Sequence, residues 1–428
     1  MVFSHNLIGI GIRERLNAKL HEFLEANGAV RLRLIQCYSH GIGKRVVAIL
    51  FGLPLVGIMY LIKPVLLIRI GVLPYQRVGH LCSNTEFWLK KQALSQTKKR
   101  GFNIFIVGTP LANRQILTMI KRRIFVLESD FFVWLVEGLK KIIPVEHWMW
   151  IDLKNSGWNS WDIWNNVKPQ LFFTAKEHRR GQEALKLMGI EEKTYVCFHA
   201  RDDRYLNSIF NDKLDVSKHN DYRNTNIENF VQAFDSFLSS PLKAVRMGAA
   251  VGQPLSTENP YIIDYATKFR SDFSDVYVMA HCKFYVGDTA GIFILASLFK
   301  RPVAMVNMVP LGLCPRSPQD IFIPKHYWHR SKERLLTFRE ITEMGADKWL
   351  RSEYFENAGI QLIENSSEEI LAVIREMNDR MDGKWIPKEG DDLLQKRFRE
   401  IFPPNHPMTG FYPRVGAQFL RQHEYLLN

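Results

Sequence analysis

The stretch CKFYVGDTAGIFILASLFKRPVAMVN, residues 282–307, decides the fold. Its apolar residues predict a buried strand at 283–286 and a second strand at 303–306. Between them, the pattern predicts a tight polar turn, GDTAG, at 287–291 and an apolar helix at 292–299. This order is a βαβ unit, so we expect a parallel sheet with a helix N-terminus at its edge. Such an N-terminus can hold a phosphate or a sugar hydroxyl.

The residues of the turn allow two interpretations. Asp288 supplies a hydrogen-bond acceptor and Thr289 a hydroxyl, while Ala290 and Gly291 let a ligand come close to the backbone. Asp and Thr are also ordinary residues at a helix N-cap. A ligand-binding turn and a capped structural turn therefore both stay open on this stretch alone.

Length, charge and cysteines limit the possible classes of protein. A chain of 428 residues predicts two domains, and a net charge of +13 predicts affinity for anions, such as a phosphorylated small molecule, an anionic membrane surface or nucleic acid. The basic residues are scattered without a nucleic-acid-binding motif, so we expect no nucleic-acid partner. The five cysteines form no CxxC pair, which disfavours a zinc site, and no GxGxxG or P-loop is present to indicate a dehydrogenase or an NTPase.

Polar residues follow several predicted strands and helix starts in the second half of the chain. The cluster His199, Arg201 and Asp202 follows a predicted strand at 194–198, and Arg246 ends the next one. The segment Arg270, Ser271, Asp272 begins a predicted helix, with Ser271 or Asp272 as its cap. Taken one at a time, each of these groups could be an ordinary ion pair on the protein surface. Arginines meeting at one sheet edge would instead form a pocket for a dianion.

The first half of the chain predicts another α/β unit. Strands are expected at 65–70, 103–107 and 123–127, with a helix at 79–90. The loop before that helix, which carries Arg77 and leads to His80, lies where open α/β sheets bind ligands. Residues 145–170, rich in Trp, Asn and Pro, predict an aromatic loop region that packs over the domain edge or cradles a sugar.

The N-terminal segment has the composition of a membrane-associating element. Residues 7–40 alternate basic and apolar positions, as in an amphipathic helix on a membrane or in a solvated helix packed on its own domain. The apolar run at 46–62 lies between basic residues, is short for a spanning helix and contains Gly52, Pro54 and Gly57. We expect it to dip into one leaflet at the cytoplasmic side of the inner membrane, which makes the protein peripheral or monotopic.

Several spaced motifs resemble a bacterial family of glycosyltransferases found with surface polysaccharide genes. More distantly, the HAR motif at 199–201 followed by the D-x6-C-x4-G spacing at 275–287 is similar to a fucosyltransferase-type pattern. Where fucosyltransferases show serines in the turn, this chain has Thr289 and Ala290, so donor identity does not transfer. The motifs are YVCFHARDDRYL (195–206), DYRNTNIENF (221–230), AVRMGAAVG (244–252), FRSDFSDVYVMAHCKFYVGDTAG (269–291) and LLIRIGVLPYQRVGHLCSNTEFWL (66–89).

The resemblance implies an α/β fold of the GT-B type, with two Rossmann-like domains facing each other across a cleft. The composition of residues 1–63 adds an N-terminal helical membrane-associated segment. We expect the rest of the chain to form an acceptor domain at 64–190, a nucleotide-sugar donor domain at 191–395 and a C-terminal helix at 396–428 that packs back on the first domain.

The implied function is transfer of a sugar from a nucleotide-sugar donor to a glycan or lipid-linked acceptor, with inversion and without a metal or other cofactor. Arg201 matches the arginine that binds the nucleotide diphosphate, and His80 and Asp202 are the candidate bases. A non-catalytic nucleotide-binding or nucleic-acid-binding protein is the alternative. The predicted donor-binding residues are His199, Arg201, Arg246, Arg270, Ser271, Asp272, Asp288, Thr289, Ala290 and Gly291.

Overall fold

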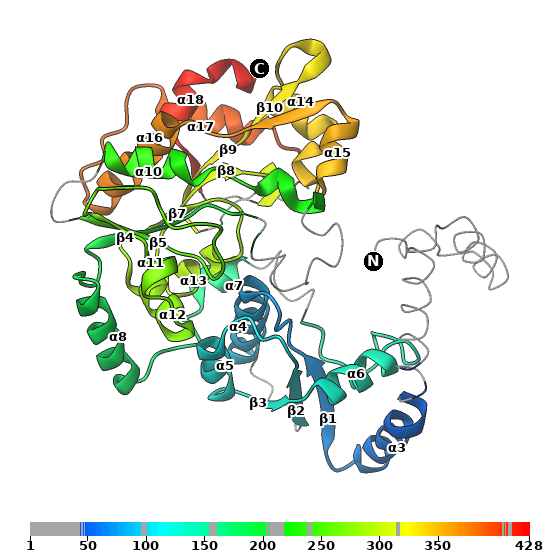
Figure 1. Cartoon of the computed structure of the whole chain (residues 1–428). Helices are drawn as coiled ribbons and strands as arrows, with labels where there is room; N and C mark the ends of the chain where they lie inside the picture. The colour runs from blue at the N-terminus through cyan, green and yellow to red at the C-terminus, as the bar shows by residue number, and fades with distance from the viewer. Residues whose placement is uncertain are drawn as a thin grey trace, which may run out of the picture. The chain divides into compact units, whose positions relative to one another are not determined.

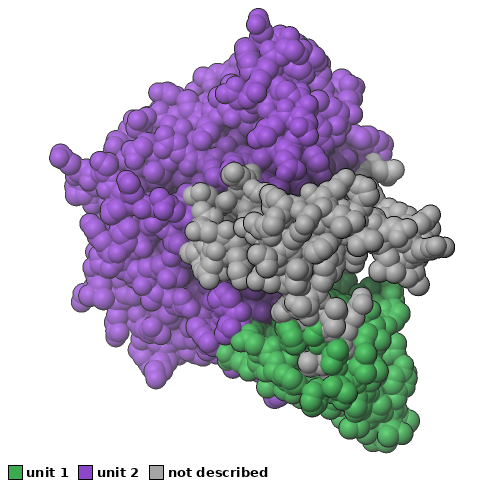
Figure 2. All heavy atoms as spheres, turned by 45° about the vertical axis from the view of Figure 1, so that its right-hand side comes forward, with its two compact units in different colours: residues 1–72, 99–108, 127–152 green, residues 73–98, 109–126, 153–428 purple. Residues whose placement is uncertain are grey.

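The computed structural model describes residues 43, 46, 48–95, 101–153, 161–202, 204, 218–237, 242–313, 317–404, 406, 408–409 and 413–428. The amphipathic helix predicted within residues 7–40 lies outside the described residues. Contacts divide the chain into two units (Figure 2). Unit 1 holds residues 1–72, 99–108 and 127–152, and unit 2 holds residues 73–98, 109–126 and 153–428.

Unit 2 is built on a seven-stranded sheet of order β13-β9-β8-β7-β4-β5-β6, in which every pair of neighbours is parallel (Figure 1). The central strands are buried along their whole length, as expected for a parallel sheet covered on both faces. The α/β class is therefore confirmed. The strands are β4 (Tyr195–His199), β5 (Lys243–Arg246), β6 (Ile262–Ile263), β7 (Tyr285–Gly287), β8 (Val303–Met308), β9 (Ile321–Pro324) and β13 (Arg414–Val415).

The βαβ unit predicted at 282–307 is present as β7, α13 (Phe293–Leu298) and β8. The strand order reverses between β4 and β7, because β5 and β6 lie on one side of this pair and β8 and β9 on the other. The register pairs His199 with Gly287, which brings the segment after β4 beside the turn after β7. In open α/β sheets, such a reversal opens a crevice at the carboxyl ends of the strands, where ligands bind.

Helices cover the sheet, and side-chain caps define where several of them begin. Ser271 caps α12 by accepting from the backbone N–H of Ser274, as predicted. Asn226 caps α10 by accepting from the backbone N–H of Glu228. The two preceding residues are engaged elsewhere, Asn224 by Arg201 after β4 and Thr225 by Asp288 after β7. The helices are α4 (Val78–Leu94), α5 (Arg114–Lys121), α7 (Trp161–Asn166), α8 (Ala175–Leu187), α10 (Ile227–Asp235), α11 (Tyr265–Lys268), α12 (Asp272–His281), α14 (Phe338–Glu343), α15 (Ser352–Asn357), α16 (Ser367–Met381), α17 (Asp391–Glu400) and α18 (Ala417–Gln422).

A buried ion pair fixes α4 within unit 2. The Lys90 ammonium donates to the carbonyl oxygen of Trp164 at 2.8 Å and lies 3.7 Å from the Glu86 carboxylate. Burial raises the pKa of Glu86 and lowers the pKa of Lys90 to about 8. Residues 161–166 of the predicted aromatic loop thus form α7, whose Trp164 indole N–H donates to the Ser297 hydroxyl at 2.9 Å.

The rest of unit 2 comprises an antiparallel sheet of order β11-β10-β12 and the C-terminal helices. These strands are β10 (His326–His329), β11 (Arg334–Leu335) and β12 (Ile360–Ile363). Whereas the C-terminal helix was expected on the first domain, α18 lies in unit 2, where Arg421 binds Asp391 and His423 binds Glu369. The α4 and α5 helices, placed by sequence in the first domain, also belong to unit 2.

Unit 1 contains β1 (Leu67–Val72) and β2 (Gly101–Val107), which pair in parallel, in a sheet of order β1-β2-β3. The third strand, β3 (Phe125–Glu128), ends in this unit, which also holds α6 (Asp130–Leu139). The apolar run at 46–62 forms a π-helical turn, η1 (Ala48–Gly52), and α3 (Leu53–Ile62). Among the described residues, no helix has both the length and the apolar character needed to cross a membrane.

Candidate active site

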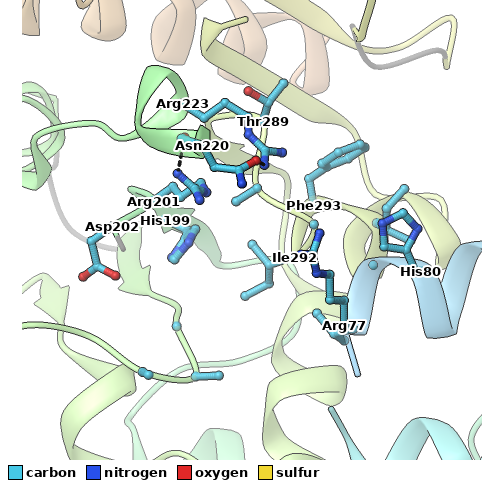
Figure 3. Close-up of a pocket in the computed structure, with 18 of the residues that line it drawn as sticks. Arg77, His80, His199, Arg201, Asp202, Asn220, Arg223, Thr289, Ile292 and Phe293 are labelled. Atoms are coloured by element: carbon cyan, nitrogen blue, oxygen red, sulfur yellow. Dashed lines mark hydrogen bonds between the residues drawn. The ribbon is translucent and has the colours of Figure 1, made fainter. Parts of the chain in front are cut away.

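A pocket of about 490 Å³ lies in unit 2 at the point where the strand order reverses (Figure 3). Its lining comes from the carboxyl ends of β4, β5 and β7, from the 3-10 helix η2 (Lys218–Arg223) and from the first turn of α4. This volume lies within the usual range for small-molecule sites. The location is therefore the one at which parallel α/β sheets hold their ligands.

Arg201 follows β4 and is anchored by both its backbone and its side chain. Its backbone N–H donates to Asp288 Oδ2 at 2.5 Å, and its guanidinium donates to the Asn220 carbonyl oxygen at 3.0 Å and to the Asn224 side chain. Burial, followed by the charge of Arg223, lowers the pKa of Arg201 to about 10. The group stays charged at neutral pH, in a fixed orientation.

Asp288 begins the turn after β7 and lies behind the pocket. It is fully buried and is not among the lining residues. Besides the N–H of Arg201, its Oδ2 accepts from the Thr225 hydroxyl at 2.6 Å, so one oxygen joins three segments of chain. Oδ1 has no hydrogen-bond partner among the described residues. Asp288 therefore positions the pocket wall. Neither Asp288 nor Thr289 caps α13, because Ile292 is the N-cap and no side-chain hydrogen bond caps the helix; ligand binding by the turn stays a prediction.

The rest of the turn forms the pocket surface. Thr289 donates its hydroxyl to the Val309 carbonyl oxygen at 2.9 Å, and Ala290 and Gly291 line the pocket. The backbone of Gly291 touches Gly79 in the first turn of α4. This contact brings the positive end of a 17-residue helix to the pocket, where free backbone N–H groups favour an anion.

Three further cationic or titratable groups meet in the pocket: Arg77, His80 and Arg223. Figure 3 shows Arg201 and Arg223 on one side and Arg77 on the other. Burial, then the charges of Arg77 and Arg223, lower the pKa of His80, and a hydrogen bond to Asn84 partly opposes this. His80 is thus neutral at pH 7, and a neutral imidazole can accept a proton.

The two polar residues that flank Arg201 have different tasks. His199 Nδ1 donates to the Met247 carbonyl oxygen at 2.9 Å; because a carbonyl only accepts, this contact assigns the proton to Nδ1 and leaves Nε2 as the acceptor of the neutral ring. Asp202 lines the pocket, but its oxygens accept from the backbone N–H groups of Arg204 and Gly252 at 3.1 and 3.2 Å. Asp202 therefore already holds two loops together.

Besides Asp288, four predicted donor-binding residues do not line the pocket. Arg246 donates to the Gln253 carbonyl oxygen at 2.7 Å and faces Asp264 at 3.5 Å, and Arg270 pairs with Asp275 at 3.1 Å. Ser271 caps α12, and Asp272 accepts from the backbone N–H of Arg114 at 2.6 Å. All four side chains thus bind neighbouring carboxylates, backbone groups or helix ends of the protein itself.

Arg77, Asn220, Tyr222 and Arg223 line the pocket but were not among the predicted donor-binding residues. The sequence did contain a pointer to Tyr222 and Arg223, because both lie in the polar segment DYRNTN that leads directly into α10. Arg77 lies in the loop singled out before α4. Away from the pocket, two groups of side chains have the composition of metal ligands: His178, Glu192 and His281, and His326, Glu369 and His423.

No protein-family model matches the chain, and no curated protein matches it in sequence. Among solved structures, a glycosyl transferase family 9 protein from Veillonella parvula is 12% identical, with a TM-score of 0.42, over 72% of this chain and 96% of that one. E. coli ADP-heptose LPS heptosyltransferase II is 12% identical, with a TM-score of 0.34, over 56% and 84%. E. coli heptosyltransferase WaaC with ADP is 11% identical, with a TM-score of 0.30, over 60% and 91%. Sequence identities and TM-scores this low do not show that this chain shares the activities of those enzymes.

Proposed function

We propose that the protein is a glycosyltransferase that takes a sugar from a nucleoside-diphosphate sugar. The observation that carries the proposal is the convergence of Arg77, Arg201 and Arg223 on one pocket with the N-terminus of α4. Such a concentration of positive charge favours an anionic ligand. A diphosphate with an attached nucleoside and sugar fits the charge, the size of the pocket and its place in the sheet.

The arginines would act on the leaving group. During transfer, the acceptor oxygen bonds to the anomeric carbon while the bond from that carbon to the diphosphate oxygen breaks. The electron pair leaves with the nucleoside diphosphate, whose growing charge Arg201 and Arg223 are placed to stabilise. Their orientation is fixed before the ligand arrives, because Asn220 accepts hydrogen bonds from both guanidinium groups.

His80 is the preferred base for the acceptor hydroxyl. It is neutral, lines the same pocket and would take the hydroxyl proton as the new bond forms. Asp202, the second candidate, is engaged by two backbone N–H groups. Attack opposite the leaving diphosphate would invert the anomeric configuration. We further propose, from the family resemblance, a glycan or lipid-linked acceptor in bacterial surface polysaccharide synthesis at the cytoplasmic side of the inner membrane.

Thermal stabilisation by nucleotides tests the ligand class. UDP or GDP is expected to raise the melting temperature of the full chain. Arg201→Gln and Arg223→Gln should abolish that rise, whereas Arg399→Gln, an exposed control on α17, should retain it. No response to any of the nucleotides would overturn the proposal.

A hydrolysis and transfer screen over sugar nucleotides tests the reaction. Release of a nucleoside diphosphate that is lost in His80→Ala, with nucleotide stabilisation retained, supports the assignment of the base. Nucleotide binding without turnover of any sugar nucleotide would favour a non-catalytic nucleotide-binding protein instead.

A further inference from the structure

The apolar run at 46–62 leaves most of its surface uncovered in unit 1. Only Ala48, Gly52, Val56 and Met59 are buried in η1 and α3, at the spacing of one helix face. That face packs on α6: a Cβ atom at Gly52 would lie 2.7 Å from Leu139 Cδ2. Eleven large apolar side chains between residues 46 and 66 are exposed: Val46, Ile49, Leu50, Phe51, Leu53, Leu55, Ile58, Tyr60, Leu61, Val65 and Leu66.

The exposure is large for individual side chains, reaching 81% for Leu61 and 86% for Val65. Unit 1 adds neighbouring apolar groups, since Phe131 of α6 is also exposed and lies edge-on to Phe51 at 6.2 Å between ring centroids. We call these twelve side chains the α3 face. An exposed apolar surface of this extent marks a site of interaction.

Aromatic and basic groups border the C-terminal end of α3. Tyr60 shares a hydrogen bond of 2.6 Å with His147 and contacts Trp148 edge-on at 5.5 Å. The Lys63 ammonium lies 4.5 Å from the centre of the Trp148 ring. Tyr and Trp rings with an apolar body and a polar tip, beside lysine, are typical of the boundary between lipid headgroups and acyl chains.

The charge of the surrounding sequence has one sign. Between residues 26 and 72 there is no Asp or Glu, whereas this range contains Arg31, Arg33, Lys44, Arg45, Lys63 and Arg69. Lys63, at the border of the α3 face, would meet the Lys63 of a second copy docked symmetrically on this face, which disfavours a dimer there. An anionic lipid surface would instead attract them.

The geometry points to the α3 face as a docking surface for the anionic headgroup region of a phospholipid bilayer. Ten α-helical residues span about 15 Å, half the thickness of the hydrocarbon core, so α3 has the length of an element that lies in one leaflet. The apolar side chains enter the upper acyl region, while Lys63 and the Tyr60–Trp148 pair stay at the headgroups.

Vesicle flotation of the full-length protein tests this proposal. The wild type should float with vesicles of phosphatidylcholine and phosphatidylglycerol, and the triple variant Leu50→Gln, Ile58→Gln, Leu61→Gln should bind at least about a hundredfold more weakly. A matched control replaces three exposed apolar residues of unit 2, Leu187→Gln, Ile386→Gln and Leu393→Gln, and should float like the wild type. Lys63→Gln should weaken binding by about fivefold on the anionic vesicles and by less on phosphatidylcholine alone.

Three outcomes would overturn the proposal: a wild type that does not float, a triple variant that floats unchanged, or a wild-type dimer that the triple substitution converts into a monomer without any vesicle binding. Circular dichroism checks the fold of each variant. Nucleotide stabilisation, measured on the same proteins, is expected to be unchanged by the triple substitution, so a failure of membrane docking is distinguishable from a failure of the proposed activity.

Discussion

A Cβ atom placed on Gly79 would lie 2.8 Å from the carbonyl oxygen of Gly291. The first turn of α4 and the turn after β7 therefore meet backbone to backbone, at a distance that only glycine at position 79 allows. Arg77 lies two residues before Gly79 and His80 directly follows it, so this contact holds the stretch of backbone that carries both pocket side chains.

Gly79→Ala is expected to push the two backbones apart. We expect a loss of about 1–3 kcal/mol in the free energy of unfolding, together with a loss of nucleotide stabilisation, because both Arg77 and the N-terminus of α4 move. Denaturant titration and nucleotide thermal shift measure the two effects. The control is Gly57→Ala on α3, where nothing lies within 4 Å of the added methyl group, and it should stabilise by about 0.5–1 kcal/mol.

Asp288 should respond differently to removal and to neutralisation. Asp288→Ala leaves the Arg201 N–H and the Thr225 hydroxyl without their acceptor and should cost about 3 kcal/mol of stability. Asp288→Asn keeps one oxygen for these donors and should cost less. Chemical denaturation of both variants measures the difference; an equal loss would show that charge, rather than hydrogen bonding, is what Asp288 contributes.

His80 should titrate below its ordinary pKa of 6.5 in the ligand-free protein. Its folded pKa lies below its unfolded pKa, so the unfolded state binds the proton first and the stability contribution falls as pH drops below about 6.5. Arg223→Gln should move the His80 resonance toward a higher pKa in an NMR titration, because a nearby positive charge is removed. Binding of a nucleoside diphosphate should also raise the pKa of His80. A pKa at or above 6.5 in the free wild type would contradict the electrostatic picture.

Lys90 and its neighbour Lys91 offer a matched pair on α4. Lys90→Met removes the paired cation of the buried Glu86 and the hydrogen bond that Lys90 donates to the Trp164 carbonyl oxygen, and should cost about 3–5 kcal/mol of stability. Lys91 is half-exposed, so Lys91→Met should change the stability by less than about 0.5 kcal/mol. Thermal denaturation of the two variants provides the comparison. Similar melting temperatures would mean that the Glu86–Lys90 pair does not fix the helix.

The sequence predicted the parts of the fold that depend on local pattern. The βαβ unit at 282–307 and the strand ending at His199 were visible because buried parallel strands are continuously apolar. Helix α7 was not visible, because Trp164 within it is held by Lys90 and Ser297, which lie more than 70 positions away in the chain.

The site residues were likewise predictable where local pattern fixes their position, and not where distant contacts do. Arg201, His80 and the turn residues Thr289 to Gly291 line the pocket, because their places follow from strand and helix ends. Arg246 and Arg270 also end or begin elements, yet Asp264 and Asp275 engage them, and the sequence alone does not show which carboxylate an arginine faces. Arg223 was passed over because its approach to Arg201 depends on η2, which links β4 to α10.

The edge strand β13 has a consequence for how the protein is made. Residues 414–415 complete the seven-stranded sheet by pairing with β9, far later in the chain than the six strands they join. During synthesis, β9 therefore presents unpaired backbone groups while almost a hundred further residues are translated. Until β13 emerges from the ribosome, this open edge can pair with another chain or be bound by a chaperone.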